Sequence, residues 1–304
     1  MDGFFVIDKP VGLTSHDVVS FVRRILRTKK AGHTGTLDPF ATGVLPVAVG
    51  RGTKAIPFLD DSVKEYRATM RLGVATDTQD CTGNALFDKE YRHVSRELLL
   101  EVFIKFTGKI RQIPPMFSAV KIGGVPLYKH ARKGNEINRP ARDIEILSLS
   151  LANLELPFVT FAVSCSRGTY VRTLANDIGE TLGCGAHLTQ LRRTRSGRFS
   201  EEEAMSLDEF VEKADKTSLE SVLISPYSAL SDLKDLQLDE TSEIKVFHGV
   251  VPEECNIIEL SGQELLQSEK FRLSRGTRLL AVAERTGCQM PGSSQNTRLL
   301  RVFT

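Results

Sequence analysis

Strand-like and helix-like segments are interleaved along the first 200 residues, without the regular alternation that produces a parallel α/β sheet. The short apolar or alternating runs typical of strands are residues 4–8, 44–49, 66–72, 144–156, 158–165 and 187–193. Apolar residues recur at helical spacing in residues 14–27, 95–106 and 169–182. Gly123-Gly124, after residues 117–122, predicts a hairpin. This order predicts a mixed sheet with helices packed on it.

The last 80 residues have a different pattern. Short strand-like runs at 257–260, 271–273, 279–283 and 299–303 are separated by turn residues and suggest a small all-β domain. Residues 201–220 carry eight acids against two lysines, which is a plausible transition between two cores. A chain of 304 residues is long enough for about two domains. We therefore expect one domain over residues 1–224 and a second over 225–304.

The charge distribution is uneven although the formal net charge is only +2. Residues 103–142 carry nine lysines and arginines against one acid, and residues 181–200 carry four arginines and no acid. Either segment alone is compatible with an ordinary solvated surface. Together they favour an anionic partner, because lysine and arginine hold phosphates.

Other features exclude whole classes of protein. The five cysteines are scattered and form no CxxC pair, which argues against a disulfide scaffold or a zinc site and fits reduced thiols in a cytosol. No apolar run reaches the ~18 residues of a membrane span. The N-terminus also lacks the pattern of a signal peptide.

Residues 31–43, AGHTGTLDPFATG, are the least ordinary segment, and their composition predicts a loop. Asp38 is its only acid. A carboxylate there can act as nucleophile or general base, or it can simply cap a turn, as Asp before Pro often does. His33 could form a dyad with it, but the G-x-S-x-G and H-E-x-x-H motifs of hydrolases do not occur. Composition and spacing alone leave the chemistry open.

Two further segments are polar. Residues 77–83 are typical of a turn. Residues 164–173, SCSRGTYVRT, place Tyr170 and Arg172 at the start of a predicted helix. There the two side chains could line a cleft, or the tyrosine could pack on the sheet while the arginine faces solvent.

Residues 31–46, AGHTGTLDPFATGVLP, resemble the catalytic loop of the TruB family of tRNA pseudouridine synthases. Further segments agree with that family in order and spacing: 5–15 (FVIDKPVGLTS), 64–80, 108–128 (with IPPMFSAVKIGGVPLY) and 164–193. The resemblance covers roughly residues 1–200. Phe40 is a small departure, since leucine is more usual there, and both are apolar anchors. Beyond about residue 225 the match is faint.

The resemblance implies a bacterial enzyme that isomerises the uridine at position 55 in the T loop of tRNA, without metal or organic cofactor. It implies an α+β fold of the pseudouridine-synthase type, with a mostly antiparallel sheet and flanking helices, followed by a small β-rich, PUA-like RNA-binding domain. It further implies a cytoplasmic monomer that binds the T arm of tRNA. Two alternatives are a T-arm-binding protein or chaperone without isomerase activity, and a hydrolase built on His33 and Asp38.

The resemblance also implies catalytic roles for three residues. Asp38 is the nucleophile, directed at C1′ of the sugar or at C6 of the base. Arg172 pairs with Asp38, and a nearby arginine lowers the pKa of a partly buried carboxyl group. Tyr66 stacks on the target base, and its hydroxyl could help in proton transfer at C5.

Five more residues are implied to bind or shape the substrate site. His33 enters the T loop, Tyr170 adds a second aromatic side chain, and Leu191 lines the pocket wall. Lys9 and Pro10 support the site without reacting. The two basic segments are expected to grip phosphates on either side of the flipped-out uridine.

Overall fold

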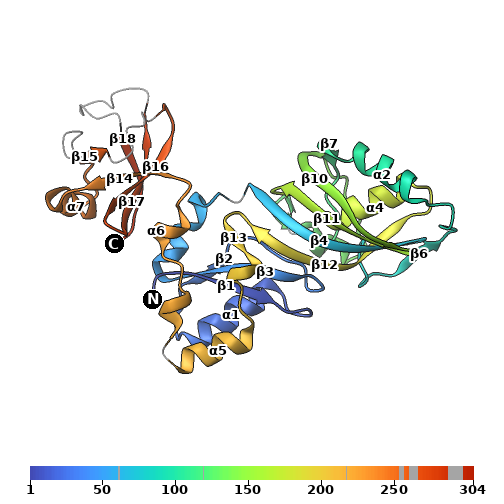
Figure 1. Ribbon diagram of the computed structural model, residues 1–304, viewed down its shortest axis with the longest axis horizontal. Coiled ribbons are helices and arrows are strands. Elements are labelled where there is room, and N and C mark those ends of the chain that lie inside the picture. Colours follow the sequence, from blue (N-terminus) through green and yellow to red (C-terminus); the bar gives the residue numbers. More distant parts are fainter. Residues whose placement is uncertain (61, 119, 217, 253–256, 260–265, 287–296) are drawn as a thin grey trace.

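The computed structural model describes residues 1–304 except 61, 119, 217, 253–256, 260–265 and 287–296. Its larger sheet has nine strands (Figure 1). The main path of that sheet runs β1 (Gly3–Lys9), β3 (Thr42–Val49), β12 (Ala186–Ser196), β4 (Val63–Leu72), β11 (Phe158–Ser166), β10 (Arg142–Glu155) and β7 (Gly108–Gln112). Within the described residues, β12 and β3 are its one parallel pair. The predicted mixed, mostly antiparallel sheet is confirmed.

The three predicted helices are also present, as α1 (Ser15–Ile25), α2 (Arg96–Lys105) and α4 (Val171–Thr181). Thr14 caps α1 through a reciprocal box with Asp17, in which each residue's side chain accepts the other's backbone N–H. The α1 face that carries Val18 and Val22 is buried in the main core.

The prediction that residues 31–43 form only a loop is wrong at both ends, since Thr42 and Gly43 already belong to β3. Ala31–His33 form a short strand, β2, paired antiparallel with the end of β3. The glycine there has little intrinsic strand propensity, but the β3 edge supplies partners for its backbone groups. The turn that carries Asp38 is therefore fixed between two paired strands. The predicted hairpin at 117–125 is confirmed but shorter, with β8 (Lys121–Ile122) and β9 (Val125–Pro126).

The acidic stretch 201–220 is not a transition between cores. Met205 bridges to Ile7 of β1, and Phe210 of α5 (Leu207–Asp215) is fully buried with its ring edge-on to Phe5. The apolar positions of this stretch complete the main core, while its acids, exposed or half-buried, line the outer side. Among the described residues before 225, the remaining strands and α-helices are β5 (Val74–Thr76), β6 (Ala85–Asp88), α3 (Leu127–Ala131) and β13 (Phe199–Ser200). Four short 3-10 helices complete this part: Gly50–Lys54, Ile56–Phe58, Glu201–Glu203 and Leu219–Val222.

The segment after residue 225 contains a second sheet of five strands. Its order is β15 (Ile257–Glu259), β14 (Lys234–Leu238), β16 (Lys270–Arg275), β17 (Arg278–Arg285) and β18 (Thr297–Val302). The predicted strands are confirmed, although residue 260, the last of the first one, lies outside the described residues. The segment is not all β, because it also contains α6 (Pro226–Ala229) and α7 (Glu240–Phe247), the latter packed against β17.

The two sheets share an apolar cluster. This cluster contains Phe4 and Val6 of β1. It also contains Leu279 and Val282 of β17 and Phe303, which directly follows β18. Burial of this cluster stabilises the contact between the two parts of the chain. The division at residues 224 and 225 stays a prediction.

Candidate active site

The turn that carries Asp38 is held by hydrogen bonds on both sides of the aspartate. Ser15, the first residue of α1, accepts a hydrogen bond at its Oγ from the Leu37 N–H at 2.8 Å and donates to the Leu37 carbonyl at 3.2 Å. The buried Lys9 Nζ donates to the Pro39 carbonyl at 3.3 Å. The backbone on either side of Asp38 is therefore fixed, which limits the positions that its carboxylate can take.

Arg172, in the first turn of α4, reaches this carboxylate. The distance from Arg172 Nε to Asp38 Oδ2 is 3.5 Å, and the Arg172 side chain is only 5% exposed, against 32% for that of Asp38. Arg172 Nη2 also donates to the Phe117 carbonyl at 2.5 Å. The structure therefore places Arg172 in contact with Asp38, while the catalytic roles of the two residues stay predictions. Asp38 thus has one side against a buried guanidinium and the other open to solvent.

Sequence reasoning missed a second carboxylate at this guanidinium. Asp80 Oδ2 lies 3.4 Å from Arg172 Nη1, and Asp80 is 2% exposed. Its carboxylate also accepts hydrogen bonds from the Thr82 N–H at 2.9 Å and the Thr78 hydroxyl at 2.8 Å. The polar turn 77–83 was the available signal, but nothing local shows that it reaches α4. Arg172 is therefore shared between a fixed, buried Asp80 and the more exposed Asp38.

Four effects act on the Asp38 carboxyl group. Burial raises its pKa, the Arg172 guanidinium lowers it, the Asp80 charge raises it again, and the Lys9 ammonium has the smallest effect and lowers it, with a net rise above the ordinary value. Arg172 is thus the main group that favours the ionised carboxylate at this position, and only the ionised form is a nucleophile.

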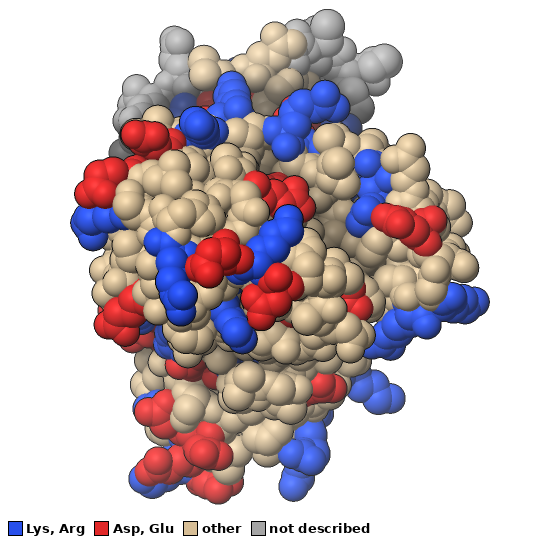
Figure 2. All heavy atoms as spheres, turned by 90° about the vertical axis from the view of Figure 1, so that its right-hand side faces the viewer, with Lys and Arg blue, Asp and Glu red and all other residues tan. Residues whose placement is uncertain are grey.

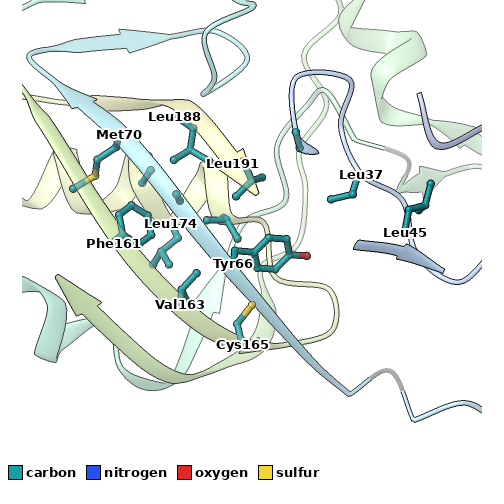
Figure 3. Close-up of a cluster of buried hydrophobic side chains, with 14 of the residues drawn as sticks. Leu37, Leu45, Tyr66, Met70, Phe161, Val163, Cys165, Leu174, Leu188 and Leu191 are labelled. Carbon is teal, nitrogen blue, oxygen red and sulfur yellow. The ribbon is translucent and has the colours of Figure 1, made fainter. Parts of the chain in front are cut away.

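Tyr66 lies next to the same turn. Its side chain, on β4, belongs to the same buried cluster as Leu191 of β12 and Leu37 of the Asp38 turn (Figure 3). Burial raises the pKa of the Tyr66 hydroxyl, and the adjoining Arg193 guanidinium opposes that rise. An aromatic ring, an ionisable hydroxyl and a carboxylate paired with arginine therefore lie around one turn.

Comparisons with known proteins identify this arrangement. A model of the TruB family pseudouridylate synthase N-terminal domain matches residues 23–171, and one of the tRNA pseudouridylate synthase B C-terminal domain matches residues 172–241. The tRNA pseudouridine synthase B of Geotalea uraniireducens is 56% identical over 100% of this chain and 98% of its own. The chain belongs to the TruB family. It is an isomerase that converts uridine in tRNA to pseudouridine.

Further relatives agree with this membership. The tRNA pseudouridine synthase B of Geobacter sulfurreducens is 54% identical, with all of both chains covered. A chain in the crystal structure of a Cbf5-Nop10-Gar1 complex superposes with a TM-score of 0.76 at 30% identity, over 99% of this chain and 85% of that one. The pseudouridine-synthase fold is thereby confirmed. The two TruB models meet at residue 172, the arginine that contacts Asp38.

The structure brings most of the other expected TruB residues near this centre. The side-chain amide of Gln112 accepts a hydrogen bond from the Tyr170 N–H and donates one to the Tyr170 carbonyl. The Tyr170 ring centroid lies 5.8 Å from the Arg172 guanidinium. Leu191 is buried in the same apolar cluster as Tyr66. His33 is half-buried in β2, and its Nδ1 has no hydrogen-bond partner among the described residues.

Lys9 and Pro10 differ in their surroundings. Lys9 is fully buried, and burial lowers its pKa to about 8. Its ammonium donates to three backbone carbonyls, which include that of Pro10 itself at 2.9 Å. Pro10 is exposed. Lys9 thus supports the Asp38 turn from within the protein.

Residues 181–200 expose less positive charge than their composition suggests, and Arg195 is the one of their four arginines that is exposed, with its Nη1 3.9 Å from Glu65 Oε1. Arg192 forms two hydrogen bonds with the Asp8 carboxylate, both 2.9 Å long, and Arg198 pairs with Glu203 at 3.1 Å. Arg193 is fully buried. These charges are largely neutralised or enclosed by groups from elsewhere in the chain, which a count of local charge does not show.

The other basic segment does expose its charge. Lys129, Arg132 and Lys133, at and just after α3, are exposed. At the end of the molecule that carries α2, lysines and arginines are interspersed with acids (Figure 2). Exposed positive charge therefore lies in residues 103–142 more than in residues 181–200.

Proposed function

We propose that the chain isomerises the uridine at position 55 in the T loop of tRNA, with Asp38 as the nucleophile. The observation that carries this proposal is the Asp38–Arg172 pair, at 3.5 Å, beside the Tyr66 ring. In the reaction the N1–C1′ bond of the nucleotide breaks and a C5–C1′ bond forms. The proton on C5 is released, and N1 gains a proton. Transient attachment of Asp38 to the sugar or the base divides this exchange into easier steps.

The surrounding residues have distinct parts in this proposal. Arg172 keeps the Asp38 carboxylate ionised and oriented, and Asp80 holds the arginine in place. The Tyr66 ring stacks on the flipped base, and its hydroxyl takes part in removal of the C5 proton. Flipping the base out of the folded T loop costs a few kcal/mol, and stacking on Tyr66 offsets part of that cost.

The remaining expected residues complete the substrate site. We assign His33 to the T loop, since it lies beside the Asp38 turn with an unpaired ring nitrogen. Tyr170 and Leu191 line the base pocket next to Arg172 and Tyr66, while Lys9 and Pro10 shape the turn. We also propose that the enzyme acts as a monomer, since no assigned role requires a residue from a second copy of the chain.

We also propose where the protein works and how the chain is divided. The T arm of tRNA is the partner, and a role in tRNA modification supports a location in the cytoplasm, where the enzyme meets its substrate. Among the described residues, no helix is long and apolar enough to cross a membrane. Residues 1–224 contain every assigned site residue, so we assign catalysis to them and binding of a more distant part of the tRNA to residues 225–304.

The decisive experiment follows the hydrogen on C5. Wild-type protein should release tritium from tRNA labelled at C5 of uridine, and from an isolated T-arm hairpin with the same label. Asp38→Asn should release none, with tRNA affinity within a few-fold of wild type. A T-arm-binding protein without isomerase activity would bind both RNAs and release no tritium. Substantial release by Asp38→Asn would show that another group is the nucleophile.

A further inference from the structure

A fully buried arginine, Arg193, lies within the sheet beside the catalytic centre. It is 0% exposed and is the largest fully buried side chain among the described residues. Burial of a guanidinium is unfavourable unless its donors are used. Arg172, Arg192 and Arg198 each pair with a carboxylate, but within the described part of the chain Arg193 forms no such pair. In the sequence alone, Arg193 is distinguished only as part of a basic segment.

The strand register explains the position of Arg193. On one side β12 pairs with β3, which places Arg193 opposite Gly43, and on the other side it pairs with β4, which places Arg193 opposite Tyr66. Directly opposed residues on antiparallel strands project to the same face of a sheet. The guanidinium therefore lies beside the Tyr66 side chain.

The hydrogen bonds of Arg193 reach the segments on both sides of Asp38. Its Nε donates to the Val44 carbonyl at 2.7 Å, and its Nη2 donates to the Gly35 carbonyl at 3.1 Å. Its Nη1 has no hydrogen-bond partner among the described residues. That leaves one buried donor available to the Tyr66 hydroxyl, which lies close enough for the two groups to change each other's pKa.

We propose that Arg193 is a positioning residue for proton transfer: it ties the Asp38 turn to Tyr66 and orients the Tyr66 hydroxyl toward the base. A fixed positive charge beside a phenol favours the form that accepts a proton. The absence of a carboxylate partner leaves that charge available to Tyr66. The inference rests on the proposed role of the Tyr66 hydroxyl at C5.

The test compares Arg193→Met, Arg193→Lys and the matched control Arg192→Met, whose side chain projects to the opposite face of the same strand. In single turnover on saturating tRNA, Arg193→Met should be slower by about 10-fold to 100-fold, with tRNA affinity nearly unchanged. Arg193→Lys, which keeps the charge, should recover part of the rate. The control should stay within about 3-fold, as expected for a partly exposed pair.

A second readout does not depend on activity. The protein has five tyrosines, so labelling their ring Cζ carbons with ¹³C gives few signals, and Tyr66→Phe identifies that of Tyr66. The Tyr66 hydroxyl should titrate at higher pH in Arg193→Met than in wild type and should not shift in Arg192→Met. An unchanged titration, or a wild-type rate in folded Arg193→Met, would overturn the inference.

Tyr66→Phe separates this inference from the proposed function. If Tyr66→Phe keeps the full rate, the proposed role of the hydroxyl is wrong, and the inference is overturned with it. If Tyr66→Phe is slow but Arg193→Met is not, only the inference about Arg193 is wrong. If neither Arg193 variant folds, the ¹⁵N signals of the Arg193 Nη groups decide: they should move in Tyr66→Phe, and unchanged signals would overturn the contact.

Discussion

Ser15→Ala should weaken the Asp38 turn without touching any group that reacts. The Ser15 side chain and Leu37 are 2% and 4% exposed, so the two hydrogen bonds between them are shielded from water. Alanine leaves a buried N–H and a buried carbonyl of Leu37 without partners. An unsatisfied buried group costs about 1–3 kcal/mol, because its lost hydrogen bond to water is not replaced.

This cost has two measurable consequences. The midpoint of urea denaturation, followed by circular dichroism, should fall by an amount equivalent to about 1–3 kcal/mol. Single-turnover tritium release should slow by about 10-fold to 100-fold, since small displacements of a reacting group have effects of that size. Affinity for tRNA should change little, because Ser15 is buried and does not reach the RNA.

Ser20→Ala provides the matched control, since Ser20 is exposed on the same helix. Its effect on stability should lie within about 0.5 kcal/mol. If Ser15→Ala were as stable and as active as Ser20→Ala, the Ser15–Leu37 contact would not fix the turn. A large loss of stability with no loss of rate would show that the position of Asp38 does not depend on this anchor.

Other predictions follow from the charges. Asp38→Asn should be at least as stable as wild type at pH 8, because burial disfavours the charged carboxylate in the folded state. In urea titrations, the difference in unfolding free energy between the two proteins should shrink as the pH falls toward the unfolded pKa of about 4. Arg172→Met removes the main group that lowers the Asp38 pKa, so the acid limb of the pH–rate profile should move to higher pH, and an unmoved limb would contradict the pairing. Replacement of Lys129, Arg132 and Lys133 by glutamine should reduce the slope of log K against log salt by up to about 3 in filter binding, and an unchanged slope would remove this segment from the RNA contact.

The sequence by itself determined the local structure and the candidate reacting groups. The capping box at Thr14, the apolar spacing of α1 and the alternation in β4 act over a few residues, so their signals survive in the sequence alone. Asp38, Arg172 and Tyr66 were found because the family motif preserves residue types in order. These inferences needed no knowledge of which segments lie side by side.

Only the tertiary structure decided how the charges are distributed around the centre. Asp80 and Arg172 are 92 residues apart in sequence, and Asp8 and Arg192 are 184 residues apart. The register of β12 between β3 and β4 encloses Arg193 beside Tyr66, while Arg192, the residue before it, is partly exposed and pairs with two carboxylates. Hydrogen bonds and ion pairs depend on distances of a few ångström between groups from distant segments, and local composition contains no information about those distances.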